Sequence, residues 1–373
     1  MRAILAGIAV AAVIAPGLAY ADHGVRGRVD YAASKIGKQE LRLTQRHGGA
    51  YTADTALYAV KLADGATVHA YCLDLAQKAV DRAPMVEAGY DEHPTGNDFQ
   101  RNSSQVNWIL QNSYPKMGLA AFSGKVGKGL TPDDAVRGTQ AAIWHYTDGI
   151  TIAPQDNNAA TTAVYSYLTG AANTGVPTEP KAALTLDTPT RPQDGSRIGP
   201  ITLHTTSEGP VPVTLTEAPA GAKLVDAQGK PVTALKDGQQ AFVSIPTGAT
   251  AGSATITARG KAVLPAGRML VQRDQKTQTL AAASDQEINA DTAASVSWTG
   301  MAVANMSGTS ANTGSADNTG STGTTTTQNS AGASSLPVTG VALSVAATAG
   351  VILLALGVTA IIVVRRRRRL FVS

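Results

Sequence analysis

The segment TPDDAVRGTQAAIWHYTDG, residues 131–149, decides the architecture expected for the first half of the chain. Thr131 is a preferred helix N-cap, and Pro132 suits the first helical turn. The acidic residues that follow favour the positive end of the helix dipole. We therefore predict a helix that starts after Thr131, runs through Tyr146 and ends near Gly149.

One polar residue interrupts the apolar face of this helix. Gln140 lies at helical spacing from three apolar neighbours, which are Val136, Ile143 and Trp144. A carboxamide that is buried without hydrogen-bond partners is costly. Gln140 is therefore either an ordinary hydrogen-bonded core amide, or its carboxamide meets a buried thiol.

Strands and shorter helices are expected around this segment. Residues 56–62 and 67–75 are strand-like and flank Ala63-Asp64-Gly65-Ala66, which predicts a β-hairpin. Further helices are expected over 102–112 and 158–168. The sequence thus predicts a mixed α+β domain over residues 22–178.

The next part of the chain has a different pattern. After the Pro-containing stretch NTGVPTEPK, short alternating runs such as Pro212-Val213-Thr214-Leu215-Thr216 are separated by Gly and Pro. This pattern predicts an all-β, Ig-like sandwich over residues 179–301. Residues 302–335 are rich in Ser, Thr and Gly and predict a disordered linker.

The N-terminus has the pattern of a secretory signal peptide over residues 1–21. Arg2 precedes an apolar run, and the small-x-small pattern Ala19-Tyr20-Ala21 predicts cleavage between Ala21 and Asp22. We therefore expect the chain to be exported.

The C-terminus has three parts in order. Leu336-Pro337-Val338-Thr339-Gly340 precedes an uncharged stretch at 341–364, which is long enough for a transmembrane helix, and a basic tail at 365–373. This order resembles the LPxTG sorting signal of sortase substrates. The resemblance implies cleavage between Thr339 and Gly340 and attachment to peptidoglycan, with the membrane a partner only of the precursor and the tail cytoplasmic. The expected location is the cell wall of a Gram-positive bacterium.

Removal of both ends changes the charge of the chain. The full sequence has 31 Lys and Arg residues against 27 Asp and Glu, and the ends hold six of the basic residues and no acids. The mature chain is therefore slightly acidic. It has no phosphate-binding glycine loop, no basic patch with interleaved aromatics and no histidine spacing typical of metal sites. We expect no nucleic-acid partner, no metal and no cofactor.

Cys72 is the single cysteine of the chain, in Ala70-Tyr71-Cys72-Leu73-Asp74. Exported proteins usually pair their cysteines, so an odd one suggests an intermolecular disulfide or a reactive thiol. A simple buried thiol in an apolar strand is the alternative.

Three motifs resemble the Cys-Gln thioester (TQXA) domains of Gram-positive surface proteins. Thr139-Gln140-Ala141-Ala142-Ile143-Trp144 matches the family's TQxAIW signature, and Tyr71-Cys72-Leu73-Asp74 is similar to its cysteine motif. The segments Val106-Asn107-Trp108-Ile109-Leu110 and Tyr114-Pro115 are similar to the region between them. The resemblance covers roughly residues 27–175.

The resemblance implies an internal thioester between Cys72 Sγ and Gln140 Cδ, formed with loss of ammonia. An amine, such as a lysine of a target protein, would then take the Gln140 acyl group and release the thiol. The chain would be a single-turnover covalent adhesin and not an enzyme. Apolar side chains should keep water from the thioester; four aromatic residues near the motifs are candidates for this wall: Tyr71, Trp108, Trp144 and Tyr146. Asp74 and His145 are weak candidates for a proton acceptor, since His145 lies about 140° from Gln140 on an ideal helix.

Two other functions fit parts of the sequence. A non-covalent structural wall protein would contain Cys72 as an inert buried residue. A surface cysteine hydrolase would use Cys72 with His145, although the local signatures of cysteine proteases are not found in the sequence. Thr216-Glu217-Ala218-Pro219-Ala220-Gly221 faintly resembles the E-x-P-x-G segment of Cna-B-like pilin domains, and a turn after a strand is the simpler interpretation.

Overall fold

The computed structural model describes residues 25–34, 39–94, 96–272 and 278–300, which all belong to one compact unit. The predicted signal peptide, linker, LPVTG motif, transmembrane segment and basic tail lie outside the described residues. None of the helices that are described is long and apolar enough to cross a membrane.

A closed six-stranded antiparallel barrel forms the centre of the first part of the chain. Its strands, in order around the barrel, are β1 (Arg26–Asp30), β4 (Tyr58–Leu62), β5 (Thr67–Cys72), β16 (Leu280–Ala282), β15 (Met269–Val271) and β6 (Pro84–Ala88). β4 and β5 form the predicted hairpin, with Tyr58 opposite Ala70. β5 ends at Cys72 and not at residue 75, because a side chain, Gln278 Oε1, accepts the Asp74 N–H at 3.0 Å.

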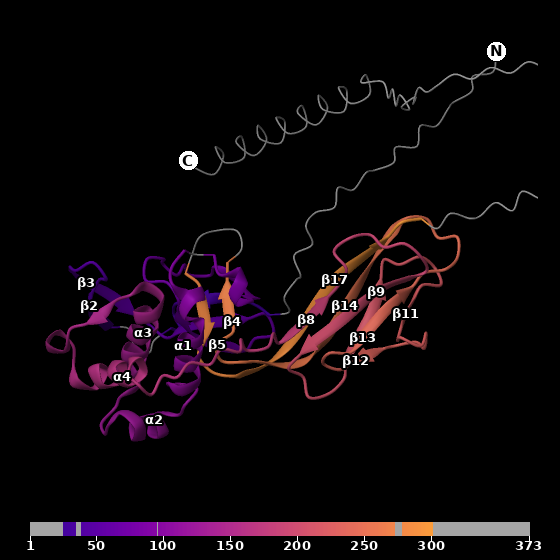
Figure 1. The fold of residues 1–373 in the computed structure, drawn as a ribbon. Coiled ribbons are helices and arrows are strands. Elements are labelled where there is room, and N and C mark those ends of the chain that lie inside the picture. Colours follow the sequence, from indigo (N-terminus) through magenta and orange to yellow (C-terminus); the bar gives the residue numbers. More distant parts are fainter. Residues whose placement is uncertain (1–24, 35–38, 95, 273–277, 301–373) are drawn as a thin grey trace, which may run out of the picture. The chain divides into compact units, whose positions relative to one another are not determined.

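Helices and a small sheet complete this part of the fold. The helices are α1 (Phe99–Asn112), α2 (Leu119–Val126), α3 (Pro132–Asp148) and α4 (Ala159–Thr169), with 3-10 turns η1 (Tyr90–Glu92) and η2 (Pro154–Asp156). The small sheet contains β3 (Ala50–Thr55), β2 (Gln39–Thr44) and β7 (Thr151–Ile152). Figure 1 shows α3 between this sheet and the other helices.

The structure confirms the predicted start and end of the central helix, α3. The Thr131 hydroxyl accepts the Asp134 N–H at 3.1 Å, and Gly149 caps the C-terminus with a φ of 69°. The helix differs from the prediction in its burial, because every residue from Asp134 to Trp144 is buried and not one stripe alone. Trp144 belongs to the core with the barrel interior, whereas Val136 and Ile143 pack in a second core with α1 and α4.

Two four-stranded antiparallel sheets form the rest of the described chain. One contains β12 (Ala234–Leu235), β10 (Val211–Thr216), β14 (Gly252–Leu264) and β17 (Gln286–Trp298); the other contains β11 (Lys223–Val225), β13 (Gln240–Ser244), β9 (Arg197–Thr205) and β8 (Leu184–Asp187). β17 contacts β8 and β9, and buried side chains from both sheets share one core.

The two-sheet part contributes two strands to the barrel. β14 and β17 pair with Leu264 opposite Gln286, and the same register continues into β15 and β16, where Met269 lies opposite Ala281. β15 then pairs with β6, and β16 with β5. Figure 1 shows these orange strands beside β4 and β5.

This ribbon crosses the boundary that the sequence predicts at residue 178. Residues 269–282 fall within the range 179–301 assigned to the sandwich, yet they close the barrel of the first part. Without them β5 and β6 would each expose an unpaired edge. A division at one point along the sequence therefore does not separate two self-contained domains.

Candidate functional site

The side-chain amide of Gln140 binds the backbone of Cys72. The Cys72 N–H donates to Gln140 Oε1 at 2.9 Å, and Gln140 Nε2 donates to the Cys72 carbonyl at 2.8 Å. Both residues are buried, with Gln140 0% and Cys72 4% exposed. The structure thus brings together the two residues that the sequence predicts as a pair.

The end of strand β4 explains why this amide fits here. The Leu73 N–H donates to Thr279 of the β16 side, so the N–H and C=O of Cys72 point to the opposite edge of β5. On that edge β4 begins only at Tyr58, which lies opposite Ala70. Gln140 from α3 takes the place of the missing strand partner, which satisfies two buried backbone groups.

The thiol of Cys72 lies in an environment that disfavours its charged form. Burial raises the pKa of the Cys72 thiol, and the nearby carboxylates of Asp74 and Asp148 raise it further. A hydrogen bond with the Tyr58 hydroxyl acts in the other direction but does not outweigh burial. Cys72 is therefore a neutral thiol at physiological pH.

A cleft of about 420 Å³ opens beside Cys72. Its lining includes four aromatic residues, one carboxylate and one ammonium group: Tyr31, Tyr51, Tyr58, Trp144, Asp54 and Lys78. The rings of Tyr31 and Tyr58 lie 6.0 Å apart. An aromatic cleft with a carboxylate suits an alkylammonium group.

Of the four aromatic residues predicted to shield the site, the structure places one at this cleft. Trp144 lines it beside Cys72. Tyr71 and Trp108 belong to the second core, where the Tyr71 hydroxyl donates to the Tyr114 carbonyl at 2.7 Å. Tyr146 packs there as well and contacts the ring of His145.

The two predicted proton acceptors differ in their placement. Asp74 lies close enough to Cys72 to affect the thiol, and its Oδ1 accepts Asn97 Nδ2 at 3.1 Å. His145 is turned to the C-terminal end of α3, where Nδ1 lies 2.9 Å from the Ile150 carbonyl and 3.0 Å from the Tyr165 hydroxyl. His145 thus has partners of its own and does not line the cleft.

Sequence reasoning missed three residues at the site. Tyr58 could not be placed from the predicted turn, because a loop of residues 63–66 would pair it with Tyr71, whereas the observed register pairs it with Ala70, on the face of β5 that Cys72 shares. Asp148, whose Oδ2 accepts the Leu75 N–H at 3.3 Å, lies two helical turns after Gln140. Gln278 lines the cleft and holds the backbone of Asp74, and nothing in the local sequence indicates this long-range contact.

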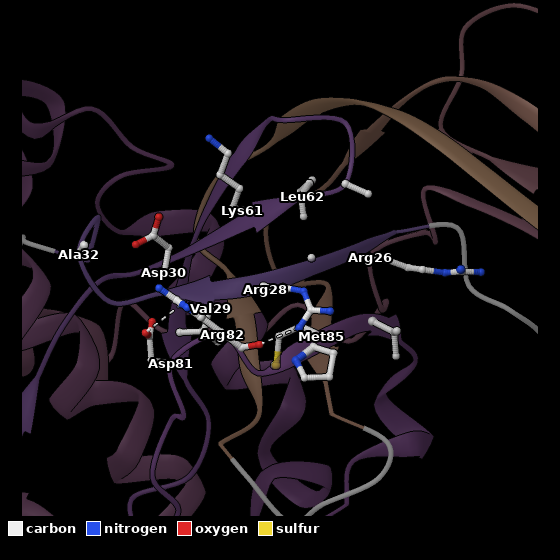
Figure 2. A pocket seen from close by; sticks show the side chains of 14 residues that line it. Arg26, Arg28, Val29, Asp30, Ala32, Lys61, Leu62, Asp81, Arg82 and Met85 are labelled. Carbon is white, nitrogen blue, oxygen red and sulfur yellow. Dashed lines mark hydrogen bonds and ion pairs between the residues drawn. The ribbon is translucent and has the colours of Figure 1, made fainter.

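Another cleft lies elsewhere, and basic side chains outnumber acidic ones among its lining residues. It has a volume of about 690 Å³ and runs along the outer face of β1. Figure 2 shows its charged side chains, which include Arg28, Lys61 and Arg82 with Asp81. Neither Cys72 nor Gln140 lines this cleft, so it is separate from the candidate site.

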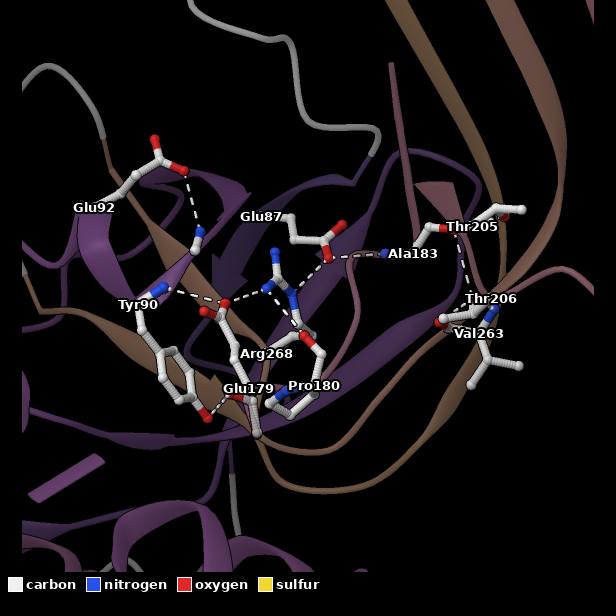
Figure 3. Close-up of polar contacts among 12 residues, drawn as sticks. Glu87, Tyr90, Glu92, Glu179, Pro180, Ala183, Thr205, Thr206, Val263 and Arg268 are labelled. Carbon is white, nitrogen blue, oxygen red and sulfur yellow. Dashed lines mark hydrogen bonds and ion pairs between the residues drawn. The ribbon is translucent and has the colours of Figure 1, made fainter. Parts of the chain in front are cut away.

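A buried ion-pair cluster joins the barrel to the residues that lead into β8. Arg268 Nε lies 2.8 Å from Glu87 Oε1, and both side chains are almost fully buried. Arg268 also pairs with Glu179 and donates to the Pro180 carbonyl at 3.1 Å, as Figure 3 shows. The Ala183 N–H donates to the same Glu87 oxygen at 3.0 Å.

Glu217 is exposed and accepts the Thr255 hydroxyl at 2.7 Å. Among the described residues, no group of three or more His, Cys, Asp or Glu side chains could hold a metal ion.

Comparison with known proteins identifies one family match. Residues 69–174 match the family model of the thioester domain (TED). No curated protein matches the sequence.

Several solved structures are similar to the chain at low identity. They include the TIE protein of Bacillus anthracis (17% identity, TM-score 0.31, 74% of this chain and 49% of that one), the thioester domain of the Enterococcus faecium TIE86 protein (17%, 0.35, 76% and 99%) and the N-terminal domain of the Streptococcus pyogenes pilus tip adhesin Cpa (15%, 0.30, 61% and 97%). The chain thus spans about half the length of the Bacillus anthracis protein. The segment with a family match is the one that contains both Cys72 and Gln140.

Proposed function

We propose that the chain is a covalent surface adhesin, in which an internal thioester between Cys72 and Gln140 acylates an amine on a target. The observation that carries the proposal is the pair of hydrogen bonds that fix the Gln140 carboxamide on Cys72, beside a cleft. The family match over residues 69–174 supports the same chemistry.

The geometry favours attack of the thiol on the amide. The Cys72 N–H donates to Gln140 Oε1, which is the oxygen that becomes negatively charged when Sγ adds to Cδ. A backbone donor fixed at that oxygen stabilises the tetrahedral intermediate. The C–N bond of Gln140 then breaks, the thiol proton ends on nitrogen, and ammonia leaves.

The second step transfers the acyl group to an amine. The amine nitrogen attacks Cδ, the C–S bond breaks, and one amine proton ends on Sγ, so that an amide to Gln140 and a free Cys72 thiol result. Each chain reacts once. The target we propose is an alkylammonium side chain such as lysine, because Asp54 and three tyrosines line the cleft.

The position of the chain on the cell is a further part of the proposal. Residues 1–21 would direct export, and a sortase would join Thr339 to peptidoglycan after cleaving at Gly340. The two sheets between residues 184 and 298 would act as an Ig-like spacer, and residues 302–335 as a linker through the wall. Threonine-to-alanine substitution at Thr339 should release the protein from the wall into the medium or leave it in the membrane.

A cysteine hydrolase is less consistent with the site. A hydrolytic cysteine needs a lowered thiol pKa, which a neighbouring histidine usually supplies. Burial raises the pKa of Cys72, and His145 is bound to Ile150 and Tyr165. An inert buried cysteine in a structural protein remains the main competitor.

Methylamine labelling separates these functions. The purified protein, prepared without reductant, should gain one methylamine at Gln140 and release one titratable thiol at Cys72. The Cys72→Ala variant should gain none. If the wild-type protein incorporates no methylamine and its thiol is unreactive, the structural-protein interpretation is the one that fits. Turnover of a peptide or thioester substrate would instead favour the cysteine hydrolase.

A further inference from the structure

The burial that protects a thioester from water creates a difficulty for its reaction. When an amine attacks Gln140 Cδ, the sulfur of Cys72 must leave. Burial raises the pKa of this thiol, and Asp74 and Asp148 add negative charge nearby. A bare thiolate is therefore a poor leaving group here, and the sulfur needs a proton as the C–S bond breaks.

Tyr58 is placed to meet this need. Tyr58 and Cys72 line the same cleft, through which an amine would enter, and each group affects the pKa of the other. The antiparallel register sets this position, since Tyr58 lies opposite Ala70, two residues before Cys72 on the same face of β5.

Other polar groups near the thiol are held differently. The Tyr31 hydroxyl donates to the Ala79 carbonyl. Asp148 Oδ2 accepts the Leu75 N–H and, at 2.6 Å, the Thr147 hydroxyl. Asp74 accepts Asn97 Nδ2 and lies 3.9 Å from His93 Nε2. Tyr58 lines the cleft together with Cys72 and lies on the same face of the sheet as the thiol.

We propose that Tyr58 is a catalytic residue that relays the proton between the incoming amine and the sulfur of Cys72. This inference rests on the proposed thioester function. In the transfer step, the Tyr58 hydroxyl gives its proton to Sγ as the C–S bond breaks and at the same time receives one from the attacking nitrogen. The two transfers are concerted, because burial raises the pKa of the Tyr58 hydroxyl as well as that of the thiol. The net change is one new C–N bond, one broken C–S bond and one proton moved from nitrogen to sulfur, with Tyr58 unchanged.

The same relay serves formation of the thioester in reverse. Tyr58 takes the thiol proton as Sγ attacks Gln140 Cδ and supplies one to the departing nitrogen. Asp54 lies near enough to affect the Tyr58 hydroxyl and can hold the ammonium form of the amine at the mouth of the cleft. Lys78, the basic residue of the lining, carries a like charge and opposes this attraction.

The test compares Tyr58→Phe with wild type and with Tyr90→Phe as a matched control. Tyr90 is a largely buried tyrosine next to the barrel strand β6, but its hydroxyl donates to the Gly267 carbonyl, away from the cleft. For each protein, the intact mass reports the thioester, and the rates of methylamine incorporation and thiol release report its reaction. The measurements are repeated with added imidazole, a small general acid and base.

The expected result is that Tyr58→Phe forms the thioester more slowly but completely before purification, and then reacts with methylamine about 100-fold more slowly than wild type, as for loss of a general acid–base group. Imidazole should restore part of this rate, whereas wild type and Tyr90→Phe should react alike with or without it. Reaction of Tyr58→Phe within about threefold of wild type would overturn the relay and leave the thioester function standing.

Two other outcomes are also decisive. If Tyr58→Phe folds without the thioester, incubation with imidazole should produce the mass loss; failure to do so would assign Tyr58 a structural role and overturn the relay. If the wild-type protein contains no thioester, the proposed function itself fails and the relay fails with it.

Discussion

Two buried polar contacts on the same barrel behave differently. Arg268 and Glu87 are opposite charges with backbone partners on both sides, including Pro180 and Ala183. Gln140 and Cys72 are neutral, and one atom of the pair, Sγ, takes no part in the hydrogen bonds that hold the amide.

The difference distinguishes a structural contact from the site that we propose to be reactive. At Arg268 the polar groups hold three chain segments together, and the cluster lies away from the cleft at Cys72. At Cys72 the backbone bonds position the carboxamide, while the thiol lies next to a cleft and to Tyr58. Buried polar groups thus fix the geometry in both places, and only the proposed reactive site lies next to this cleft.

The largest expected effect comes from removing the thiol. A thioester between Cys72 and Gln140 would close a loop as a disulfide does, so Cys72→Ala should lower the free energy of unfolding by about 4 kcal/mol and abolish amine incorporation. Wild-type protein treated with methylamine should show the same loss. Denaturant unfolding of the three samples measures it, and equal stabilities would argue against a crosslink.

Gln140→Ala extends this comparison to the hydrogen bonds. Cys72→Ala keeps both bonds from Gln140, because they go to the backbone of residue 72. Gln140→Ala leaves a buried N–H and C=O without these partners and should be less stable than Cys72→Ala by about 2 kcal/mol. Equal stability of the two variants would mean that the amide does not support the end of β5.

Disruption of the ion pair between Arg268 and Glu87 should lower the stability of the protein without preventing its reaction with methylamine. Arg268→Ala leaves Glu87 buried and uncompensated, which should cost about 3 kcal/mol in unfolding free energy. The double variant Arg268→Met with Glu87→Leu removes both charges and should recover most of this loss. Both variants should incorporate methylamine at the wild-type rate while they are folded. A large drop in incorporation would mean that the ion pair affects the site at Cys72 and Gln140.

The smallest expected effect tests the charge at the cleft. Asp54→Asn should slow reaction with methylamine, which is mainly a cation at neutral pH, by about threefold at low salt, as for a weak exposed ion pair. Reaction with hydroxylamine, which is mainly neutral at that pH, should not change. Equal slowing of both nucleophiles would assign Asp54 a role in packing.

Local signals in the sequence predict the helix and the hairpin that contain Gln140 and Cys72, but not the barrel that surrounds them. The N-cap at Thr131 and the stop at Gly149 identify α3, and the turn at 63–66 identifies the β4–β5 hairpin. These features depend on neighbouring residues alone. Pairing of β16 with β5 joins residues more than 200 positions apart, and no local pattern specifies it.

Proximity to a motif in the sequence does not tell which aromatic side chains line the cleft, as Trp144 and Tyr71 show. Both are aromatic and adjacent to a motif, yet Trp144 lines the cleft and Tyr71 points into the second core. In a strand, successive side chains face opposite sides, so Tyr71 and Cys72 cannot share a wall. The α3 helix is buried on all sides, which removes the polar face that would have oriented it from sequence.

The intact mass of the protein, purified without reductant and measured under denaturing conditions, tests the central claim most directly. With a thioester, the wild-type mass is lower by one ammonia than the mass calculated from the sequence. The Cys72→Ala variant should have the mass calculated from its own sequence. A wild-type mass equal to that of the unmodified chain would contradict it.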